Sequence, residues 1–212
     1  MKTIALFGGS GRTGQHFLQQ ALAQGHSIRA LVRTPSKVNA DADTASLELI
    51  QGDVLNYADV LETVKGTDLV VSLFGHVKDS PAWLQTDGTR NILRAMQKQK
   101  VERIISLSGG GLPYEQDQPK FVDKAIRLVM KVAVPKILND AVKHAEVLRD
   151  SDRTWTIVRG PRLTDEPKQG NYRVGWVGVN AGTKVGRADL ADFVLQLVED
   201  TQYDGQMPFV SY

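Results

Sequence analysis

The glycine-rich segment near the N-terminus constrains the fold of this chain more than any other feature. Residues 8–14 read GGSGRTG and follow the short apolar run Thr3–Phe7 directly. Apolar side chains then recur at helical spacing in residues 17–22. Glycines let a backbone turn sharply and let other groups approach it closely. The segment therefore predicts a buried strand, a tight glycine turn and an amphipathic helix, in that order.

The spacing of the glycines is that of a turn that binds a pyrophosphate. Gly8 permits the tight turn, Gly11 lets a phosphate approach the backbone, and Gly14 lets the helix pack against the strand. The first N–H groups of the helix would face the anion. A nucleoside-triphosphate loop is excluded, because Gln15 and His16 replace the lysine and the hydroxyl that it needs. The predicted dinucleotide contacts in this turn are Gly8, Ser10, Gly11, Arg12, Thr13 and Gly14.

Short apolar runs alternate with helical patterns along the chain. The runs lack polar alternation, as strands covered on both faces do, and they lie at Thr3–Phe7, Ile28–Val32, Leu47–Ile50, Leu69–Leu73, Ile104–Leu107 and Thr156–Val158. Helical patterns lie at about Thr13–Gln24, Ala58–Val64, Thr89–Gln99 and Asn139–Ser151. We therefore expect an α/β fold: one doubly wound, mainly parallel Rossmann-type sheet with helices on both faces, in a single domain over residues 1–212.

Two segments leave alternatives open. The glycine- and proline-rich stretch 109–119 follows a predicted strand, so it is either an active-site loop or a mobile surface connection. The segment Phe121–Leu138 is apolar and basic at helical spacing. Such a pattern occurs in helices that lie on membranes, but an ordinary covering helix has it too, and we expect a covering helix and no membrane partner.

Arg33 indicates which dinucleotide is bound. Rossmann folds that bind NAD(H) carry an acidic residue at the end of the second strand, about 20 residues after the glycines, and this chain has Arg33 there. A guanidinium can bind a ribose 2′-phosphate, with Arg12, Ser36 and Lys37 as neighbours. We predict NADP(H) in preference to NAD(H). The alternative is that these basic residues are only solvated turn residues.

Composition excludes several other classes of function. Without cysteine, disulfides and thiolate chemistry are absent. Basic and acidic residues, 26 and 24 in number, are spread along the chain, which argues against a nucleic-acid partner. The four histidines show no spacing typical of a metal site, and no metal is expected. No apolar run is long enough to span a bilayer, so we expect a cytoplasmic protein.

The chain as a whole resembles the atypical short-chain dehydrogenases/reductases, which have one NAD(P)-binding domain. The matching stretches lie at 8–14, 31–33, 52–54, Gly75, 89–92, 147–151, 156–161, 187–191 and 203–205. Within that group the chain is most similar to the biliverdin reductase B/flavin reductase branch, and it has NmrA-like relatives as well. The glycine turn, residues 52–55 (GDVL) and residues 203–205 (YDG) carry this finer likeness.

The resemblance implies further cofactor contacts. It places Asp53 and Val54 beside the adenine; Leu73, Phe74 and Gly75 under the cofactor; Ser106 toward the nicotinamide; and Pro161 at the other side of the site. Asp53 could instead cap the next helix. Ser106 and Ser108 could instead satisfy backbone groups at a strand end.

The resemblance breaks down at the proton donor. Conventional members use Tyr-x-x-x-Lys, and here the fourth residues after Tyr57, Tyr114, Tyr172 and Tyr203 are Leu61, Gln118, Trp176 and Met207. The flavin reductase branch has a serine near the nicotinamide and a histidine after Pro-Pro, whereas this chain has Ser108 and, after Gly160-Pro161, Arg162. Ser108 and Arg162 are therefore the candidate catalytic residues. His76, after Gly75, is a further candidate for a substrate contact, although a core or surface role is more common.

These observations favour an NADPH-dependent oxidoreductase that passes hydride to a small planar conjugated acceptor such as a flavin, a quinone or a linear tetrapyrrole. Such acceptors can take their proton from water, so a fixed acid is dispensable. One alternative is a non-catalytic NADP(H)-sensing regulator of the NmrA-like type. Another is a sugar-nucleotide epimerase or dehydratase, which usually needs the Tyr-Lys pair. The acceptor and the oligomeric state are not encoded in any motif of the sequence.

Overall fold

A single eight-stranded sheet organises the molecule. The structure, a computed structural model, describes residues 1–39 and 44–212. Within this part of the chain the strands run in the order β3-β2-β1-β4-β5-β6-β10-β8. All neighbours pair in parallel except β8, which is antiparallel to β10. The predicted doubly wound, mainly parallel α/β sheet is confirmed.

Six of the strands are those that the apolar runs predict, with ends shifted by at most two residues. They are β1 (Thr3–Phe7), β2 (Ser27–Val32), β3 (Leu47–Gln51), β4 (Leu69–Ser72), β5 (Arg103–Gly109) and β6 (Thr154–Gly160). Four three-residue strands lack such a run: β7 (Arg162–Thr164), β8 (Arg173–Gly175), β9 (Lys184–Gly186) and β10 (Phe209–Ser211). β7 and β9 form a separate parallel pair beside the main sheet.

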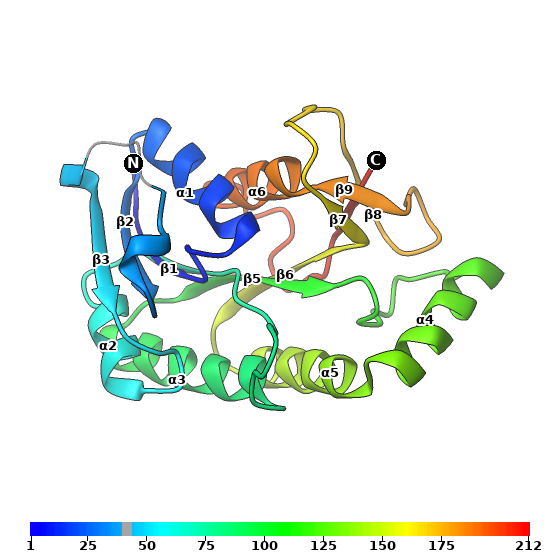
Figure 1. The fold of residues 1–212 in the computed structure, drawn as a ribbon, viewed down its shortest axis with the longest axis horizontal. Coiled ribbons are helices and arrows are strands. Elements are labelled where there is room, and N and C mark those ends of the chain that lie inside the picture. The colour runs from blue at the N-terminus through cyan, green and yellow to red at the C-terminus, as the bar shows by residue number, and fades with distance from the viewer. Residues whose placement is uncertain (40–43) are drawn as a thin grey trace.

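Helices cover both faces of the sheet (Figure 1). One face carries α1 (Arg12–Ala23) and α6 (Arg187–Gln196), and the other carries α2 (Tyr57–Val64), α3 (Leu84–Gln99) and α5 (Pro135–Arg149). Two apolar cores follow from this layering. Leu6, Phe17 and Val194 belong to the first, and Phe7 and Ile92 belong to the second. Consecutive residues of β1 thus enter opposite cores, as the pleat of a strand requires.

The predicted helix Phe121–Leu138 is two helices. α4 (Phe121–Ala133) ends at Val134, whose backbone has φ −139° and ψ 51°, and Pro135 opens α5. Proline lacks an N–H and disfavours a helical conformation of the residue before it, so one continuous helix cannot form.

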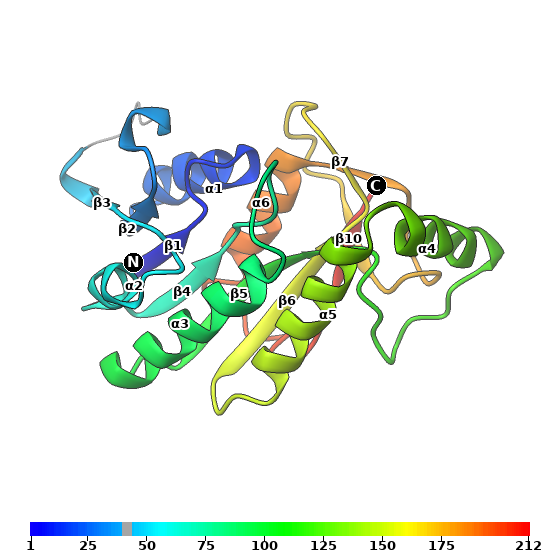
Figure 2. The same cartoon turned by 60° about the horizontal axis from the view of Figure 1, so that its bottom comes forward.

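α4 leaves the layered body of the protein. It projects past the end of the sheet in both views (Figures 1 and 2). None of its residues is buried. The expectation of an ordinary covering helix is therefore wrong, because a covering helix buries one face. In residues 1–39 and 44–212 no helix is long and apolar enough to cross a bilayer.

Candidate functional site

The glycine turn has the geometry that its sequence predicts. Gly8 has a φ of +89°, and a Cβ there would lie 2.5 Å from the backbone nitrogen of Phe74. The Gly11 N–H donates to the Gly8 carbonyl oxygen over 3.0 Å. A Cβ at Gly14 would lie 2.0 Å from that same oxygen. The three glycines therefore let β1, the turn and α1 lie closer together than larger residues allow.

The N-terminus of α1 is left free for an anion. Gly11 is the N-cap residue, it provides no side-chain cap, and the first turn of α1 contains no acidic residue. The first N–H groups of a helix carry partial positive charge and need a partner. A pyrophosphate at this turn would supply that partner.

A cavity of about 160 Å³ opens beside the turn, at the carboxyl ends of β1, β2 and β4. We call it the glycine-turn cavity. Nine predicted cofactor contacts line it: Gly8, Ser10, Gly11, Arg33, Asp53, Val54, Leu73, Phe74 and Gly75. Six further lining residues are not among the predicted contacts, although three of them belong to the stretches that carry the resemblance: Phe7, Leu31, Val32, Gly52, Val77 and Leu84. Phe7, Leu31 and Val32 lie at the carboxyl ends of predicted strands, which is the signal that could have identified them.

Five predicted cofactor contacts lie outside this cavity: Arg12, Thr13, Gly14, Ser106 and Pro161. Thr13 and Gly14 are buried in the turn itself. Pro161 lines a second cavity, described below. Direct contacts between these residues and a cofactor stay a prediction.

The two arginines assigned to the 2′-phosphate differ in their surroundings. Arg33 is exposed at the end of β2 and makes no hydrogen bond or ion pair with another residue of the described ranges. Arg12 instead pairs with Asp165 over 3.3 Å, and Asp165 also pairs with Arg187 over 2.7 Å. Arg12 is thus directed to the segment after β7, and Arg33 alone remains a free cation at the cavity.

Asp53 does not cap the helix that follows it. The Asn56 side chain caps α2 by accepting from the Ala58 N–H over 3.0 Å. The Asp53 carboxylate accepts from the Leu55 N–H over 2.9 Å, which closes a tight turn at the cavity wall. The alternative of a helix cap is wrong, and the residue lines the predicted cavity.

The serines of β5 do not satisfy backbone groups. The Ser106 hydroxyl lies 3.0 Å from Nε2 of His144 on α5. The Ser108 hydroxyl oxygen is buried and has no hydrogen-bond partner among the described residues. Neither serine lines the glycine-turn cavity or the second cavity. Ser108 thus offers an unused polar group at the end of the central strand.

Strand and helix geometry place Ser108 above a buried carboxylate. Ser106 and Ser108 face the same side of the sheet, about 6.6 Å apart along β5. α5 runs antiparallel to β5, so Asp140 lies one turn, about 6 Å, beyond His144 in the same direction. Ser108 therefore stands over the turn of α5 that carries Asp140.

Asp140 joins two parts of the site and was not predicted. It is fully buried and accepts from the backbone N–H groups of Gln85 (2.8 Å) and Thr86 (3.0 Å) at the start of α3. Its Oδ2 also lies 2.7 Å from Nε2 of His76. His76 is held in this way at the carboxyl end of β4, directly after a residue of the glycine-turn cavity. No motif marks Asp140 in the sequence, because its partners are 54 to 64 residues away.

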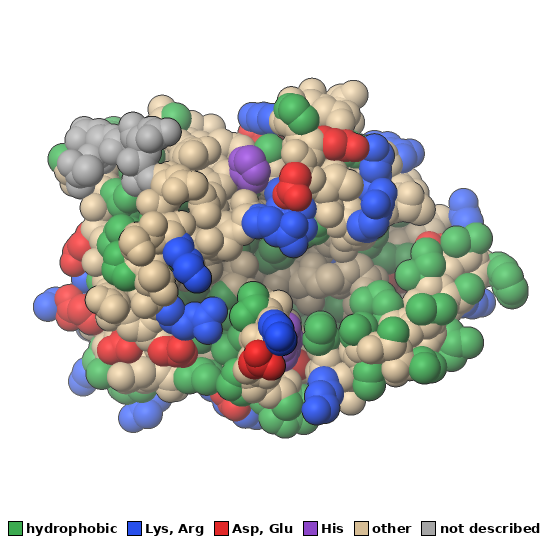
Figure 3. All heavy atoms as spheres, in the orientation of Figure 1, with side chains coloured by type: hydrophobic (Ala, Val, Ile, Leu, Met, Phe, Trp, Pro, Cys, Tyr) green, Lys and Arg blue, Asp and Glu red, His purple; other side chains and the backbone are tan. Residues whose placement is uncertain are grey.

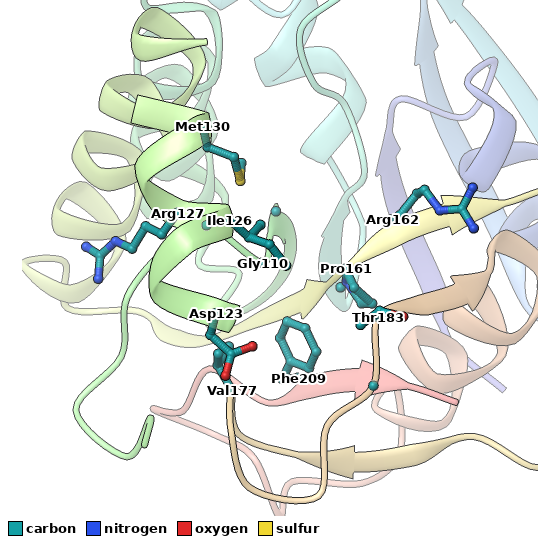
Figure 4. Close-up of a pocket in the computed structure, with 14 residues that line it drawn as sticks. Gly110, Asp123, Ile126, Arg127, Met130, Pro161, Arg162, Val177, Thr183 and Phe209 are labelled. Atoms are coloured by element: carbon teal, nitrogen blue, oxygen red, sulfur yellow. The ribbon is translucent and has the colours of Figure 1, made fainter. Parts of the chain in front are cut away.

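A second cavity, of about 540 Å³, lies at the carboxyl ends of β5 and β6. We call it the α4 cavity. Backbone and apolar side chains dominate its walls: Gly109, Gly110, Gly111, Gly160, Pro161, Gly182, Thr183, Val177, Phe209, Ile126 and Met130, with Asp123, Arg127 and Arg162 at the rim. Ile126 and Met130 point from α4 toward Pro161, whereas the guanidinium groups of Arg127 and Arg162 point away from the centre (Figure 4).

The glycine-rich loop 109–119 lines the α4 cavity at its start and is held by an ion pair near its end. Gly109, Gly110 and Gly111 line the cavity. The Arg159 guanidinium, fully buried, donates to both carboxylate oxygens of Asp117 over 2.8 Å. This charged, two-point contact fixes the far end of the loop. The loop therefore lines a cavity and is held at its far end, and its role at a ligand site stays a prediction.

At Tyr114, Tyr203 and Tyr212 the pKa of the phenol is shifted away from that of a catalytic acid. A Tyr-Lys pair works by lowering the pKa of the phenol, and burial raises the pKa of both Tyr114 and Tyr203. Burial and hydrogen bonding to Asp189 raise the pKa of Tyr212 to about 12. The described residues also contain no group of three acidic or histidine side chains that could hold a metal.

Comparison with known proteins agrees with the fold and the turn. Residues 8–201 match the NAD(P)H-binding family. The chain is 29% identical to the uncharacterized protein YwnB of Bacillus subtilis, over 96% of this chain and 95% of that protein.

Solved structures with the same fold include the oxidoreductase ylbE of Lactococcus lactis, at a TM-score of 0.81 and 20% identity, covering 99% of this chain and 90% of that one. A short-chain dehydrogenase/reductase of Veillonella parvula, solved with NADP, has a TM-score of 0.75 and 16% identity and covers 100% and 95%.

The fold and the glycine turn define a Rossmann-type dinucleotide-binding protein. Since the family match spans most of the chain, the protein belongs to the NAD(P)H-binding family. Its cofactor is accordingly a nicotinamide dinucleotide, and the turn, the free helix end and the apolar walls of the glycine-turn cavity fit such a group.

Proposed function

We propose that the protein is an NADPH-dependent oxidoreductase that passes hydride to a planar conjugated acceptor. The observation that carries this proposal is the position of the two cavities. The glycine-turn cavity lies over β2, β1 and β4, and the α4 cavity lies over β5 and β6. These strands are consecutive neighbours in the sheet, so the cavities lie side by side along one edge. Ligands bind at this edge in open α/β sheets.

The first cavity supplies what a dinucleotide needs. The turn at Gly8 and Gly11 and the N-terminus of α1 offer N–H groups to the pyrophosphate, and Val54 and Phe74 offer apolar walls to a ring. When bound, a reduced nicotinamide supplies a hydride, which is two electrons and one proton.

The second cavity suits a flat, largely apolar acceptor. Glycine backbone and Pro161 form one side, Ile126 and Met130 form the other, and Phe209 also lines the space. A volume of about 540 Å³ falls in the ordinary range for small-molecule sites. The likeness to the flavin reductase branch supports a flavin or a linear tetrapyrrole, and the apolar walls suit a quinone equally well. The Lactococcus lactis protein with the same fold is an oxidoreductase, which supports the reaction class.

No side chain is required as a proton donor in this proposal. The acceptor gains the hydride, and the second proton of its reduced form comes from water. Ser108 is a weak acid, and a guanidinium such as Arg162 stays charged near neutrality. Positioning of the two ring systems then supplies most of the acceleration.

Arg33 supports NADPH as the cofactor. Arg33→Ala should weaken NADPH binding roughly ten- to a hundredfold and leave NADH binding unchanged, because one charge-assisted contact to the 2′-phosphate is lost. Isothermal titration calorimetry with both cofactors measures this. Arg90→Ala is the matched control, since Arg90 is a similarly exposed arginine paired with Asp87 on α3. Equal affinities of the wild type for both cofactors would show that Arg33 is only a surface residue.

Turnover tests the proposal as a whole. Purified protein with NADPH and a panel of flavins, quinones and biliverdin should show NADPH oxidation with at least one acceptor, followed by absorbance. If NADPH binds tightly and no acceptor is reduced, the enzyme proposal fails and the non-catalytic NADP(H)-sensing role replaces it.

A further inference from the structure

The outer face of α4 is the most apolar exposed surface of the described chain. Eleven large apolar residues are exposed, and six of them belong to this thirteen-residue helix: Phe121, Val122, Ile126, Leu128, Val129 and Val132. A seventh, Ile137, follows on α5. Phe121 is 86% exposed and Val132 is 77% exposed. In the space-filling view these side chains gather over α4 at the right of the molecule (Figure 3).

Different sides of α4 have different surroundings. At about 100° per residue, Ile126 and Met130 fall on the side that lines the α4 cavity. Phe121 and Val132 fall roughly 140–160° around the helix from these two, and Val129 falls between the two sides; all three are exposed. Exposed contiguous apolar surface of this kind marks an interaction site.

The same segment is strongly basic. Residues 120–137 contain Lys120, Lys124, Arg127, Lys131 and Lys136 against the single acid Asp123, which is a net charge of +4. The whole chain has a net charge of +2. The remaining residues therefore carry −2, and the positive charge of the molecule is concentrated beside its apolar helix.

We propose that α4 docks on an anionic lipid bilayer, lying in the plane of the interface. An amphipathic helix with aliphatic and aromatic residues on one side and lysines on the other binds in this way, through apolar burial plus attraction to acidic headgroups. A second copy of the chain is a poorer occupant. A symmetric pair would bring two segments of +4 together, and like charges oppose that contact.

Docking would also place the α4 cavity at the bilayer surface. This step rests on the proposed function. If α4 docks in this way, the acceptor should be a lipophilic ring system such as a long-chain quinone. It would leave the bilayer and enter the α4 cavity past Ile126 and Met130.

Vesicle sedimentation tests the docking without any turnover. Full-length protein should sediment with vesicles of phosphatidylcholine and phosphatidylglycerol, and much less with phosphatidylcholine alone. Val129→Ser/Val132→Ser should abolish sedimentation, whereas Trp83→Ser, which removes an exposed aromatic outside α4, should leave it unchanged. Lys124→Gln and Lys131→Gln should each weaken binding to the anionic vesicles roughly fivefold.

Several results would overturn the docking. One is wild-type protein that stays in the supernatant with anionic vesicles; another is a serine double variant that sediments like the wild type. Self-association in sedimentation velocity that the double variant loses would assign the face to a second copy instead. Circular dichroism and NADPH affinity, which α4's outer face should not affect, verify that the variants fold.

The acceptor class is tested separately. Wild-type protein should reduce a long-chain quinone dissolved in anionic vesicles, and Val129→Ser/Val132→Ser should lose this reaction while retaining activity with a water-soluble flavin. Equal vesicle-quinone rates would contradict delivery from the bilayer. If the wild type reduces no acceptor at all but sediments with vesicles, the proposed function fails and the docking stands.

Discussion

At the scale of single residues, Gly14 shows how closely the turn and its helix are packed. A methyl group at Gly14 would lie 2.0 Å from the Gly8 carbonyl oxygen, and that backbone oxygen cannot move without opening the turn. Gly14→Ala should lower the free energy of unfolding by about 2 kcal/mol or more, as overpacking does. Gly75→Ala is the control, since nothing lies within 4 Å of a Cβ there, and it should change stability by less than about 0.5 kcal/mol. Urea unfolding of both variants checks this, and equal stabilities would contradict the close packing.

Among single side chains, Ser108 is the strongest candidate for a role in the reaction, because its buried hydroxyl has no hydrogen-bond partner among the described residues. If positioning dominates, Ser108→Ala should reduce the chemical step by less than the roughly 10²–10⁴-fold that general acid–base catalysis supplies. Single-turnover kinetics with saturating NADPH and varied flavin separate binding from chemistry. A loss above about a thousandfold in the chemical step would instead identify Ser108 as the proton donor.

At the scale of elements, the contact between α5 and β5 makes stability depend on pH. Burial lowers the pKa of His144 to about 4 from an unfolded value of 6.5. The unfolded chain therefore binds a proton that the folded chain rejects, and folding stability falls as the pH drops from 6.5 toward 4. The loss is on the order of 3 kcal/mol and is absent above pH 6.5.

His144→Gln should flatten this part of the profile while keeping a hydrogen-bonding group near Ser106. Urea unfolding at a series of pH values measures both proteins. A wild-type profile that matches the variant across this range would show that His144 is not buried as a neutral side chain.

Elements differ in how far the sequence reveals them. Strands β1 to β6 could be predicted because each contains a short apolar run, which is largely buried in all of them except the edge strand β3. The glycine turn could be predicted because its spacing is tied to one geometry. β7 to β10 could not, since three residues give no periodicity. The early start of α3 at Leu84, before the predicted Thr89, depends on Asp140, a distant residue that caps its first N–H groups. Such partners are set by the folded sheet and leave no local signal.

At the scale of the whole molecule, both cavities lie where neighbouring strands of the sheet end. The glycine-turn cavity draws largely on residues that motifs identify, so most of it was predicted. The α4 cavity is formed by segments from residue 109 to residue 209, and the sequence predicts only residues 160–162 and the glycine loop at this part of the site. Its outer wall, α4, was expected to cover the sheet, because an exposed amphipathic helix and a covering helix share one pattern.

In the proposed function the cofactor occupies the glycine-turn cavity and the acceptor occupies the α4 cavity. Gly11 and Gly109 test this arrangement as a pair, because each lines one cavity only. A Cβ at Gly109 would meet nothing within 4 Å, so Gly109→Leu can fill the α4 cavity without strain at its base. Gly11→Val would occupy the space where the pyrophosphate meets the backbone.

The decisive measurement is NADPH affinity and acceptor reduction in wild type, Gly11→Val and Gly109→Leu, each verified as folded by circular dichroism. Gly11→Val should lose NADPH binding. Gly109→Leu should bind NADPH like the wild type but should no longer reduce the acceptor. Wild-type NADPH affinity in Gly11→Val, or undiminished acceptor reduction in Gly109→Leu, would contradict this arrangement.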